Sequence, residues 1–421
     1  MHIVILHDTL PPDEQDDAAA VWQLGQGLIA AGQRVTFVTS TPGPARVENR
    51  GGIAVHLLHS RYATRWAAWY GLFNPQTVLP LTRTLRRLKP DIVHAHDVHT
   101  HLSYHSIVIG RRVGAGTVFT SRDTLPFTYG PLTYPLARAA QGCSDWDYRI
   151  PLGHNVRQAG LRWNPTRNLS IRHTMRYYTH VRIAVSAAHR QALAANRFPP
   201  FEVIYDGIDP DAVPLPAALD ALRQRLRLGS RPVILLAGGP HADSRLDGEP
   251  HMLAALRRVR RRVPDAALWI WGADEERIER LRRDHPDLAD ALILPGHGAE
   301  GVPRATACAL ADVLAFPAAA FVPFPRVVLE AMAAGRAPVV SCFGGAPEAV
   351  SDGESGFAVH PHDVDALADR IARLLADADL RHRMGEAARH RVQMMFSLER
   401  HTAAMLDAYE RAYVRRKGAG P

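Results

Sequence analysis

Residues 324–335, in the second half of the sequence, have the pattern of a helix that begins shortly after a strand ending at Phe316. The first turn of a helix presents unpaired N–H groups and the positive end of the helix dipole, which together bind phosphate groups. We therefore expect the backbone at Val327 and Val328 to contact a diphosphate. Glu330 lies one turn further into this helix, where its carboxylate can accept hydrogen bonds from the two hydroxyls of a ribose.

A group of histidines follows the strand predicted at 91–95 and raises the question of a metal site. The group comprises His94, His96, His99, His101 and His105. His94 and His96 lie at the end of the strand, whereas the other three enter the next loop and helix without a carboxylate arrangement that would complete a site. We therefore expect no metal here.

The elements that position these residues follow from the hydrophobic pattern. Short apolar, β-rich runs alternate with amphipathic stretches, which is typical of parallel sheets covered by helices on both faces. The first series of predicted strands is 2–6, 35–39, 53–58, 91–95, 117–120, 182–185 and 202–205. The second series is 232–237, 267–271, 291–294, 313–316, 338–341 and 357–359. Because ligands bind beyond the carboxyl ends of such strands, two doubly wound α/β sheets facing each other would create a cleft.

A chain of 421 residues is too long for a single core, and two domains are the simplest prediction. The proline-containing stretch 209–231 separates the two series of strands and is predicted to be a linker. The first domain is then 1–212 and the second 213–396. A last helix, 397–417, is predicted to pack back on the first domain. The stretch 124–172 is too long for a simple connection, and we expect it to shape a ligand cleft.

Arginine supplies almost all of the positive charge. The formal net charge is +8, and Lys89 and Lys417 are the only lysines. A guanidinium group binds phosphate bidentately, so phosphorylated ligands, anionic membranes and nucleic acid are the partner classes to consider. We expect no nucleic acid, because the arginines are scattered over predicted helices and are not interleaved with aromatic residues on one strand face.

The cysteines and the N-terminal residues are typical of a cytoplasmic protein. Cys143, Cys308 and Cys342 are odd in number and far apart, so we expect a reduced chain. Residues 1–6 form a short apolar run without a basic lead or a cleavage site, which predicts a first strand and not a signal peptide. No run of about eighteen apolar residues occurs, so we expect no membrane span.

The order of several segments is similar to that in family-four glycosyltransferases, the retaining GT-B enzymes. Residues 324–335 resemble the family's sugar-nucleotide signature, in which a Phe-Gly pair is followed by Glu-Ala-Met-Ala-x-Gly. Residues 341–353 resemble the segment after this signature, and 91–96, 184–186 and 206–209 fall in the expected order. The resemblance covers nearly the whole chain and implies the GT-B fold, with two Rossmann-like domains facing across a cleft.

The resemblance implies transfer of a hexosyl unit from a nucleotide-diphosphate sugar to an acceptor hydroxyl, with retention of configuration and without a metal or cofactor. It places His96 at the cleft, and it places Arg122 and Asp123 where relatives carry His-Asp or Arg-Asp near the reacting sugar. These three are the predicted catalytic residues, with Asp123 orienting the acceptor hydroxyl. Glu348 is predicted to help order the turn at residues 344–345, on the donor side.

Several positions depart from the family pattern. Val322 stands where the family has the first glutamate of its Glu-x7-Glu pair, and Pro325, which lacks an N–H, replaces a glycine. After the strand at 232–237, Gly239 and Asp247 stand where the family has an arginine and a lysine that hold the diphosphate. These departures support an alternative function: a catalytically weak or inactive relative that binds a nucleotide or glycan, or regulates a partner.

Two other arginines are candidates to replace the missing diphosphate contacts. Arg245 lies six residues after Gly239, which matches the family's spacing from arginine to lysine, and Arg326 lies at the entrance of the helix at 324–335. Cations held at a departing diphosphate stabilise charge that develops in the transition state. We therefore predict that Arg245 and Arg326 bind the diphosphate, with backbone contacts from Gly238 and Gly239. The alternative is that both arginines are solvated.

Aromatic residues recur at helical spacing between Tyr62 and Phe73, beside Arg61 and Arg65. Such a stripe belongs either to the core or to a face that docks on an anionic membrane and reaches a lipid-linked acceptor. The predicted location is therefore the cytoplasm, with peripheral attachment at the inner face of the membrane as the alternative. The acceptor stays open among a glycan, a lipid-linked molecule and a small molecule.

Overall fold

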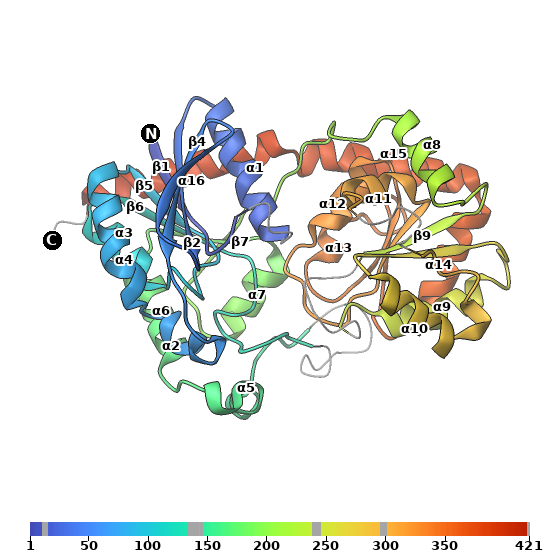
Figure 1. Cartoon of the computed structure of the whole chain (residues 1–421), viewed down its shortest axis with the longest axis horizontal. Coiled ribbons are helices and arrows are strands. Elements are labelled where there is room, and N and C mark those ends of the chain that lie inside the picture. The colour runs from blue at the N-terminus through green and yellow to red at the C-terminus, as the bar shows by residue number, and fades with distance from the viewer. Residues whose placement is uncertain (11–15, 134–142, 144–145, 238–245, 295–300, 419–421) are drawn as a thin grey trace. The chain divides into compact units, whose positions relative to one another are not determined.

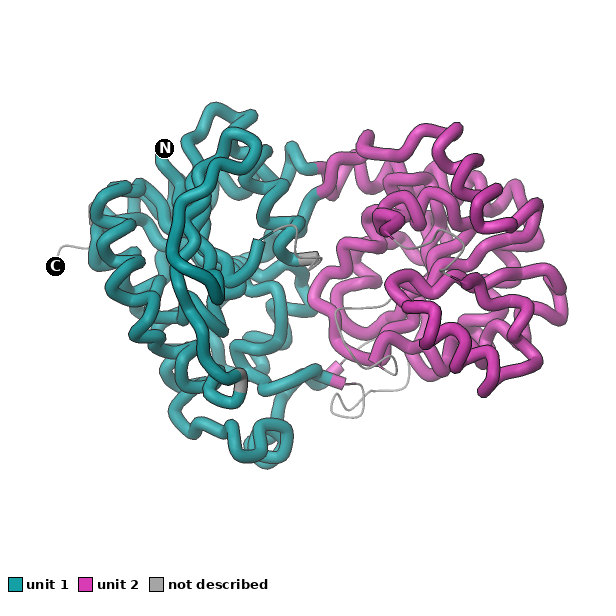
Figure 2. The backbone as a smooth tube through the Cα atoms, in the orientation of Figure 1, with its two compact units in different colours: residues 1–132, 147–207, 398–421 teal, residues 133–146, 208–397 magenta. Residues whose placement is uncertain are grey.

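The computed structural model describes residues 1–10, 16–133, 143, 146–237, 246–294 and 301–418 (Figure 1). The chain divides into two compact units, which are coloured separately in Figure 2. Unit 1 consists of Met1–Leu132, Asp147–Gly207 and Leu398–Pro421, and unit 2 of Thr133–Trp146 and Ile208–Ser397. The change from unit 1 to unit 2 at Gly207 comes five residues before the predicted boundary at 212. Residues 133–146, which the sequence predicts in the first domain, belong to unit 2.

Unit 1 is built around an eight-stranded sheet with the order β3-β4-β2-β1-β5-β6-β7-β8. The pairing of β3 with β4 is antiparallel, and the other pairings of these described strands are parallel. The central strand β1, His2–Leu6, is buried along its whole length, as expected for a parallel strand covered on both faces. The other strands are β2 Arg34–Thr41, β3 Arg46–Arg50, β4 Ile53–His59, β5 Ile92–Ala95, β6 Gly116–Ser121, β7 Val181–Ala184 and β8 Glu202–Val203.

The helices of unit 1 connect its strands, and α3 illustrates how the local sequence sets their limits. Asn74 caps the start of α3 by accepting a hydrogen bond from the amide of Gln76 (3.0 Å), and Lys89 ends it with a left-handed φ of 47°. The helical segments are α1 Asp16–Ala30, η1 Thr64–Trp66, α2 Ala67–Tyr70, α3 Pro75–Leu88, α4 His105–Arg112, α5 Leu152–Ala159, η2 Gly160–Arg162, α6 Arg167–Tyr177 and α7 Ala187–Ala195.

The last helix, α16 Leu398–Gly418, belongs to unit 1 although unit 2 precedes it in the sequence. Four of its residues are buried in the same hydrophobic core as strands β1 and β2: Met405, Ala408, Tyr409 and Ala412. The core of unit 1 is therefore completed by residues from the end of the chain.

Unit 2 contains a five-stranded parallel sheet with the order β10-β9-β11-β12-β13. Its strands are β9 Val233–Ala237, β10 Ala267–Trp271, β11 Val313–Phe316, β12 Pro338–Ser341 and β13 Phe357–Val359. Its helical segments are α8 Pro216–Arg225, α9 Glu249–Val259, α10 Glu275–Asp284, η3 Pro286–Leu288, α11 Arg304–Leu310, α12 Arg326–Ala333, α13 Ala346–Ala349, α14 Val364–Ala376 and α15 Ala378–Met395. A separate hydrophobic core lies between this sheet and its helices.

The two sheets, which are parallel except for the pairing of β3 with β4, confirm the predicted α/β class. The strand predicted at 291–294 is reduced to a single bridge between Leu268 and Leu292. Strand β3 was not predicted, because its residues are mostly polar and incompletely buried, so no apolar run marks it. No helix within the described ranges is long and apolar enough to cross a membrane.

Cys143 and Cys342 form a disulfide, with their Cα atoms 5.5 Å apart. The expectation of a fully reduced chain is therefore wrong for this pair. The two cysteines are separated by 199 residues in the sequence, and sequence spacing gives no information about the distance between such segments in the fold. Cys308 is buried and forms no disulfide among the described residues, and its Sγ lies 3.9 Å from the carbonyl oxygen of Val327.

Candidate active site

In unit 1, polar side chains gather where three neighbouring strands end, at the edge where parallel sheets bind ligands. These side chains are His7 and Asp8 after β1, His96 and Asp97 after β5, and Arg122 and Asp123 after β6. Asp8 orders the loop after β5, because its oxygens accept hydrogen bonds from the amides of Thr100 (2.7 Å) and Leu102 (2.6 Å). Sequence reasoning missed this role, because no local spacing connects Asp8 to that loop.

His96 and Arg122, two of the predicted catalytic residues, are both buried beneath this edge. Burial, together with the nearby His94 and Arg122, holds the pKa of His96 well below its usual range. His96 Nδ1 accepts a hydrogen bond from Arg122 Nε at 3.2 Å, and Arg122 Nη1 donates to Asp206 at 2.6 Å. A neutral imidazole and a paired guanidinium therefore lie under the loops and help to hold the ends of β5 and β6.

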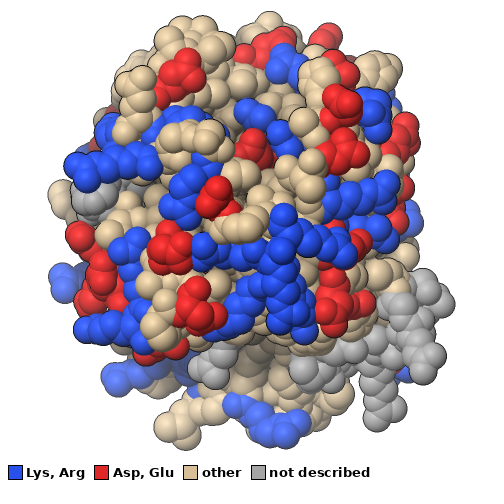
Figure 3. Space-filling model, turned by 90° about the vertical axis from the view of Figure 1, so that its right-hand side faces the viewer, with Lys and Arg blue, Asp and Glu red and all other residues tan. Residues whose placement is uncertain are grey.

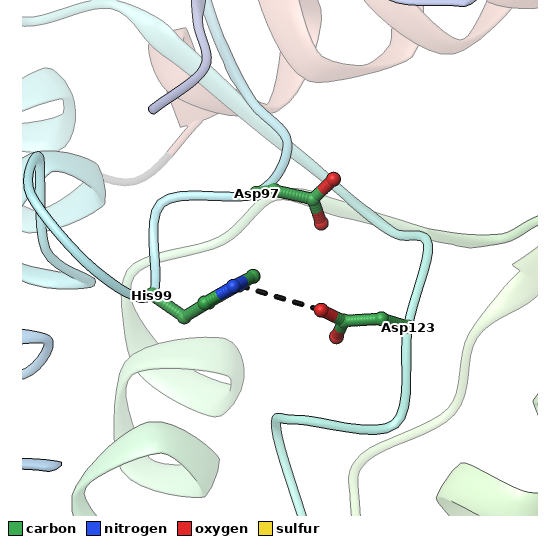
Figure 4. Close-up of side chains that lie close together, drawn as sticks. All are labelled: Asp97, His99 and Asp123. Atoms are coloured by element: carbon green, nitrogen blue, oxygen red, sulfur yellow. Dashed lines mark ion pairs between the residues drawn. The ribbon is translucent and has the colours of Figure 1, made fainter. Parts of the chain in front are cut away.

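Asp123, the third predicted catalytic residue, lies next to His99 and Asp97 (Figure 4). One of its carboxylate oxygens is 3.6 Å from His99 Nδ1, and 29% of its side chain is exposed. The protein surrounds the rest of this carboxyl, and burial raises the pKa of Asp123 to about 6, although His99 acts in the opposite direction. Burial alone would lower the pKa of His99, but the carboxylates of Asp123, Asp97 and Asp8 outweigh this effect and raise it.

The group Asp97, His99 and Asp123 has two possible chemical uses. One ligand atom from each residue lies within 4.8 Å of the others, a spacing that suits a divalent cation. Without a cation, His99 balances the two carboxylates when its ring is protonated, and these carboxylates raise its pKa. The sequence alone shows no carboxylate arrangement around these histidines, and the pairing of β5 with β6 brings Asp123 beside His99. That the protein works without a metal stays a prediction.

The other histidines of the predicted group point to different parts of unit 1. His94 is buried between Thr120 and Tyr409, with both ring nitrogens 2.8 Å from a hydroxyl oxygen. His101 is hydrogen-bonded to Ser60 at 2.9 Å. His105 begins α4. The five histidines therefore do not form one site.

In unit 2, the predicted diphosphate contact is the first turn of α12. The amide of Val328 donates to the carbonyl of Pro325 at 3.1 Å, so this N–H is used within the turn. Val327 is the second residue of the helix, where an amide has no intrahelical acceptor. Of the two predicted backbone donors, Val327 is thus the one whose position leaves its N–H for a ligand.

Glu330 is held by two arginines. Arg304 donates to both carboxylate oxygens, at 2.8 and 2.9 Å, and Arg326 Nε donates to one of them at 3.2 Å. Burial would raise the pKa of Glu330, but the two guanidinium groups outweigh it and lower the pKa. A carboxylate has about four acceptor positions. Among the described residues, these three hydrogen bonds leave one position, on the oxygen that Arg304 Nε contacts, for a ligand hydroxyl.

Arg304 is a site residue that sequence reasoning missed, and the ion pair of Arg326 with Glu330 was not predicted either. The Arg304 guanidinium lies 5.6 Å from the ring centroid of Trp271, the last residue of β10. Arg326 is buried and its guanidinium contacts Glu330, one helical turn away. A role of Arg326 at the diphosphate stays a prediction.

The turn at Gly344 and Gly345 packs against the backbone of Val322. Gly344 has a φ of +86°, and a Cβ atom there would lie 2.7 Å from the carbonyl oxygen of Val322. The amide of Gly345 donates to the same carbonyl at 2.9 Å. Glu348 follows in α13, and its amide donates to the carbonyl of Gly345 at 3.2 Å. The turn thus requires glycine for steric reasons and fixes the position where the family has its first glutamate.

The loop after β9 is described only in part. Gly238, Gly239 and Arg245, three predicted donor contacts, lie outside the described residues. Asp247 is buried, and Gly248 has a φ of +83° at the start of α9. Asp247 therefore does not present an exposed side chain at the position of the family's lysine.

A segment from the first half of the chain, 133–146, contributes to the carboxyl edge of the unit-2 sheet. Thr133 forms an antiparallel bridge to Ala320, which follows β11. Cys143 is bonded to Cys342, which follows β12. Sequence reasoning predicted that an insertion here shapes a ligand site but did not identify these contacts.

Trp146, at the end of this segment, lies over the same edge. Its ring is 4.8 Å from that of Phe343 and stacks at 5.9 Å on His360, which follows β13. The described residues of the segment thus contact the residues after three successive strands. A tryptophan ring at this edge is suited to packing against the apolar face of a sugar.

Two sequence families match the chain. The profile described as Glycosyl transferases group 1 matches residues 244–391, and the profile described as Glycosyltransferase Family 4 matches residues 18–212. The chain belongs to the family-four glycosyltransferases. Sucrose-phosphate synthase from Thermosynechococcus elongatus superposes with a TM-score of 0.74 and 22% identity, covering 98% of this chain and 99% of that one. Anabaena HepE in complex with UDP and glucose gives a TM-score of 0.68 at 16% identity, covering 97% and 98%. These likenesses confirm the GT-B fold.

Curated relatives of this family member are similar over part of their length. GDP-mannose-dependent alpha-(1-6)-phosphatidylinositol monomannoside mannosyltransferase of Mycolicibacterium smegmatis is 36% identical over 225 residues, which are 51% of this chain and 55% of the relative. D-inositol 3-phosphate glycosyltransferase of Saccharomonospora viridis is 32% identical over 209 residues, 50% of this chain and 41% of the relative. The chain spans about half the length of the curated relatives it matches.

Proposed function

We propose that this protein transfers a hexosyl unit from a nucleotide-diphosphate sugar to an acceptor hydroxyl, with retention of configuration. The observation that carries the proposal is the Glu330 carboxylate, paired with Arg304 and Arg326 in the first turns of α12, the helix that follows β11, in a chain of this family. Relatives named as GDP-mannose-dependent, and neighbours solved with UDP, support a nucleotide sugar as donor.

On the donor side, the proposal assigns the ribose to Glu330 and the diphosphate to the start of α12. A ribose hydroxyl donates to the remaining acceptor position of Glu330, and the Val327 amide donates to a phosphate oxygen. Arg326 and Arg304 keep Glu330 ionised, and their positive charge favours the diphosphate. Arg245 is proposed to contact the diphosphate as well. No cofactor beyond the donor is proposed.

On the acceptor side, the proposal assigns the reacting hydroxyl to Asp123. Its ionised carboxylate accepts a hydrogen bond from the hydroxyl and so orients the oxygen toward the donor sugar. His99, 3.6 Å away, stabilises the ionised form. His96 and Arg122 are assigned a positioning role, because the hydrogen bond between them holds the starts of the loops after β5 and β6.

Release of nucleoside diphosphate from a panel of UDP, GDP and ADP sugars tests the proposal. The 421-residue chain is expected to release the nucleotide from one donor class, and Asp123→Asn to slow that release. The alternative is a relative that binds a nucleotide or glycan without turnover, and Val322 in place of the family glutamate favours it. Binding of UDP or GDP by calorimetry without release from any of the sugars would decide for the alternative.

A further inference from the structure

Charge is distributed differently over the two units. On unit 2, arginines of α9 and the turn after it pair with carboxylates, and Figure 3 shows basic and acidic side chains interspersed on one face. The pairs are Arg257–Asp287, Arg258–Asp365, Arg260–Asp290 and Arg262–Asp369. In unit 1, the stretches 49–90 and 148–201 contain no Asp or Glu, but seven and nine Lys or Arg residues. These two stretches carry positive charge that they do not balance themselves.

The two acid-free stretches meet in unit 1. The helical turn η1 contacts η2, and Asn164 Nδ2 donates to the carbonyl of Ala68 in α2 at 3.1 Å. We call the surface formed by η1, α2, α5, η2 and the start of α6 the basic face. Arg65, Arg157 and Arg162 are exposed on it.

Large apolar side chains are exposed on the basic face. Leu152 is 69% and Leu169 64% exposed, and Leu161 is fully exposed. Trp66 and Trp69 are about half exposed. Single exposed apolar side chains are normal on a protein surface, but five on neighbouring elements of one unit mark a candidate interaction surface.

The aromatic stripe predicted between Tyr62 and Phe73 divides between core and surface. The rings of Tyr62 and Tyr70 pack 4.5 Å apart, and the Tyr62 hydroxyl donates to the carbonyl of Thr100 at 2.5 Å. Phe73, like the two tryptophans, is about half exposed. The stripe therefore packs in part against unit 1, and docking of its exposed rings on a membrane stays a prediction.

A pocket of about 420 Å³ opens beside the exposed leucines, and its lining is basic. Leu152 and Leu169 belong to the lining, and so do Arg172 and Arg197. Arg172 Nη1 makes one long hydrogen bond, 3.4 Å, to the carbonyl of Asn196. Among the described residues, no ion pair with a carboxylate is found for Arg172 or Arg197, whereas Arg149, in the same lining, pairs with Asp147 at 2.8 Å.

Asn155 lines the same pocket and is 6% exposed. Its Nδ2 donates to the carbonyl of Phe127 at 3.0 Å, whereas its Oδ1 has no hydrogen-bond partner among the described residues. A buried acceptor of this kind is costly unless a donor reaches it. A ligand with an anionic group for the arginines and a hydroxyl for Asn155 matches this lining.

The geometry points to a docking surface for an anionic membrane on the basic face, with the pocket holding the phosphate of a lipid headgroup that also carries a hydroxyl. The exposed leucines and tryptophans enter the headgroup region, where apolar side chains are removed from water. The unbalanced arginines are attracted to an anionic leaflet. A membrane fits better than a protein partner, because the face combines exposed apolar side chains with an excess of positive charge. The inference goes beyond the transfer reaction and depends only on the surface of unit 1.

Flotation of the 421-residue chain with phosphatidylglycerol vesicles tests the inference, because this lipid carries both a phosphate and hydroxyls. The protein is expected to float with these vesicles and to stay behind with phosphatidylcholine vesicles. R172A/R197A is expected to bind phosphatidylglycerol vesicles at least about tenfold more weakly. L161S/W66S is expected to weaken binding as well, because it removes the inserting side chains.

R258A/R262A is the matched control, since it removes two arginines that pair with carboxylates of unit 2, and its vesicle binding is expected to be unchanged. No flotation, or equal flotation of R172A/R197A, would overturn the inference. Saturable binding of free sn-glycerol 3-phosphate without flotation would assign the pocket to a soluble phosphate instead. Retention of an RNA oligonucleotide that depends on Arg172 and Arg197, again without flotation, would also overturn it. Nucleotide release measured on the same variants in solution keeps the two proposals separate.

Discussion

Glu330 is bound by Arg304 and Arg326, and replacing it by Gln keeps its size but removes the charge that balances them. We expect Glu330→Gln to lower the free energy of unfolding by about 3 kcal/mol, because two largely buried guanidinium groups lose their anionic partner. We also expect the KM for the donor to rise at least about tenfold, because a ribose hydroxyl loses a charged acceptor. Urea denaturation and initial rates at varied donor concentration measure these effects.

Glu276→Gln is the control for this change, because Glu276 makes an exposed pair with Arg280 on α10. Its effect on stability is expected to stay within about 0.5 kcal/mol. Equal stability and equal KM in Glu330→Gln and in the unmodified protein would contradict the role assigned to this glutamate.

The pKa of Asp123 predicts a pH dependence of the reaction. Burial raises this pKa to about 6, so the carboxylate that accepts the acceptor hydroxyl is lost as the pH falls below about 6. We expect kcat/KM for the acceptor to decline below that pH, and Asp123→Asn to be slower at neutral pH and to lack this inflection. Initial rates measured across this pH range check both expectations.

The same pKa predicts that the folded protein is more stable at low pH. Between about pH 4 and 6 the folded chain holds a proton on Asp123 that the unfolded chain has released. The free energy of unfolding of the unmodified protein, relative to Asp123→Asn, should therefore fall as the pH rises through this range.

At this scale the sequence predicts residues that share an element and not those that meet across the fold. The place of Glu330 in the site can be predicted from the helix pattern after β11, because helix and strand lie within one stretch of sequence. The place of Arg304 cannot be predicted in this way, because Arg304 reaches Glu330 from the start of another helix, α11. The sequence reveals His99 only as one of five histidines, because Asp123 comes beside it through the pairing of β5 with β6.

At the scale of the elements, the disulfide between Cys143 and Cys342 has the clearest consequence for stability. It ties the segment at 133–146 to the end of β12 and closes a loop of 199 residues. Cross-links that close long loops stabilise most in the chain-entropy account, so Cys143→Ser is expected to lower the free energy of unfolding of unit 2 by about 3–5 kcal/mol. Urea denaturation followed by tryptophan fluorescence measures this, since Trp146 packs beside the bond on Phe343. A thiol reductant should reproduce the loss in the unmodified protein and have no further effect on Cys143→Ser; an additional loss in the variant would argue against the bond.

The hydroxyl of Tyr409 joins helix α16 to strand β5 through His94 Nδ1, at 2.8 Å. Tyr409→Phe keeps the buried ring and leaves that ring nitrogen without its partner, so we expect unit 1 to lose about 1–2 kcal/mol of stability. Thermal unfolding followed by circular dichroism checks this. Tyr177→Phe, at an exposed position of α6, is the control and should leave the transition unchanged. Identical transitions for both variants would show that the hydrogen bond does not contribute.

At the scale of the whole molecule, the alternation of apolar runs predicts two α/β sheets, because parallel strands buried on both faces leave a clear signal. The assignment of residues 133–146 to unit 2 is not predictable from that pattern. It depends on contacts of Cys143 and Trp146 that connect distant parts of the chain. The return of the last helix to the first domain is, by contrast, predicted from the sequence as the helix at 397–417, and residues of α16 lie in the core of unit 1.

The position of α16 predicts that removing the end of the chain damages the two units unequally. Deletion of residues 398–421 takes Met405, Ala408, Tyr409 and Ala412 out of the core of unit 1, whereas the core of unit 2 contains none of these four residues. Large buried side chains each contribute about 2–5 kcal/mol, and a domain is stable by only about 5–15 kcal/mol in total, so unit 1 is expected to lose its cooperative fold. Amide hydrogen exchange should then show loss of protection in β1, β2 and β5 and retained protection in β9, β11 and β12. Retained protection of β1 after the deletion would mean that the core of unit 1 is complete without its last helix.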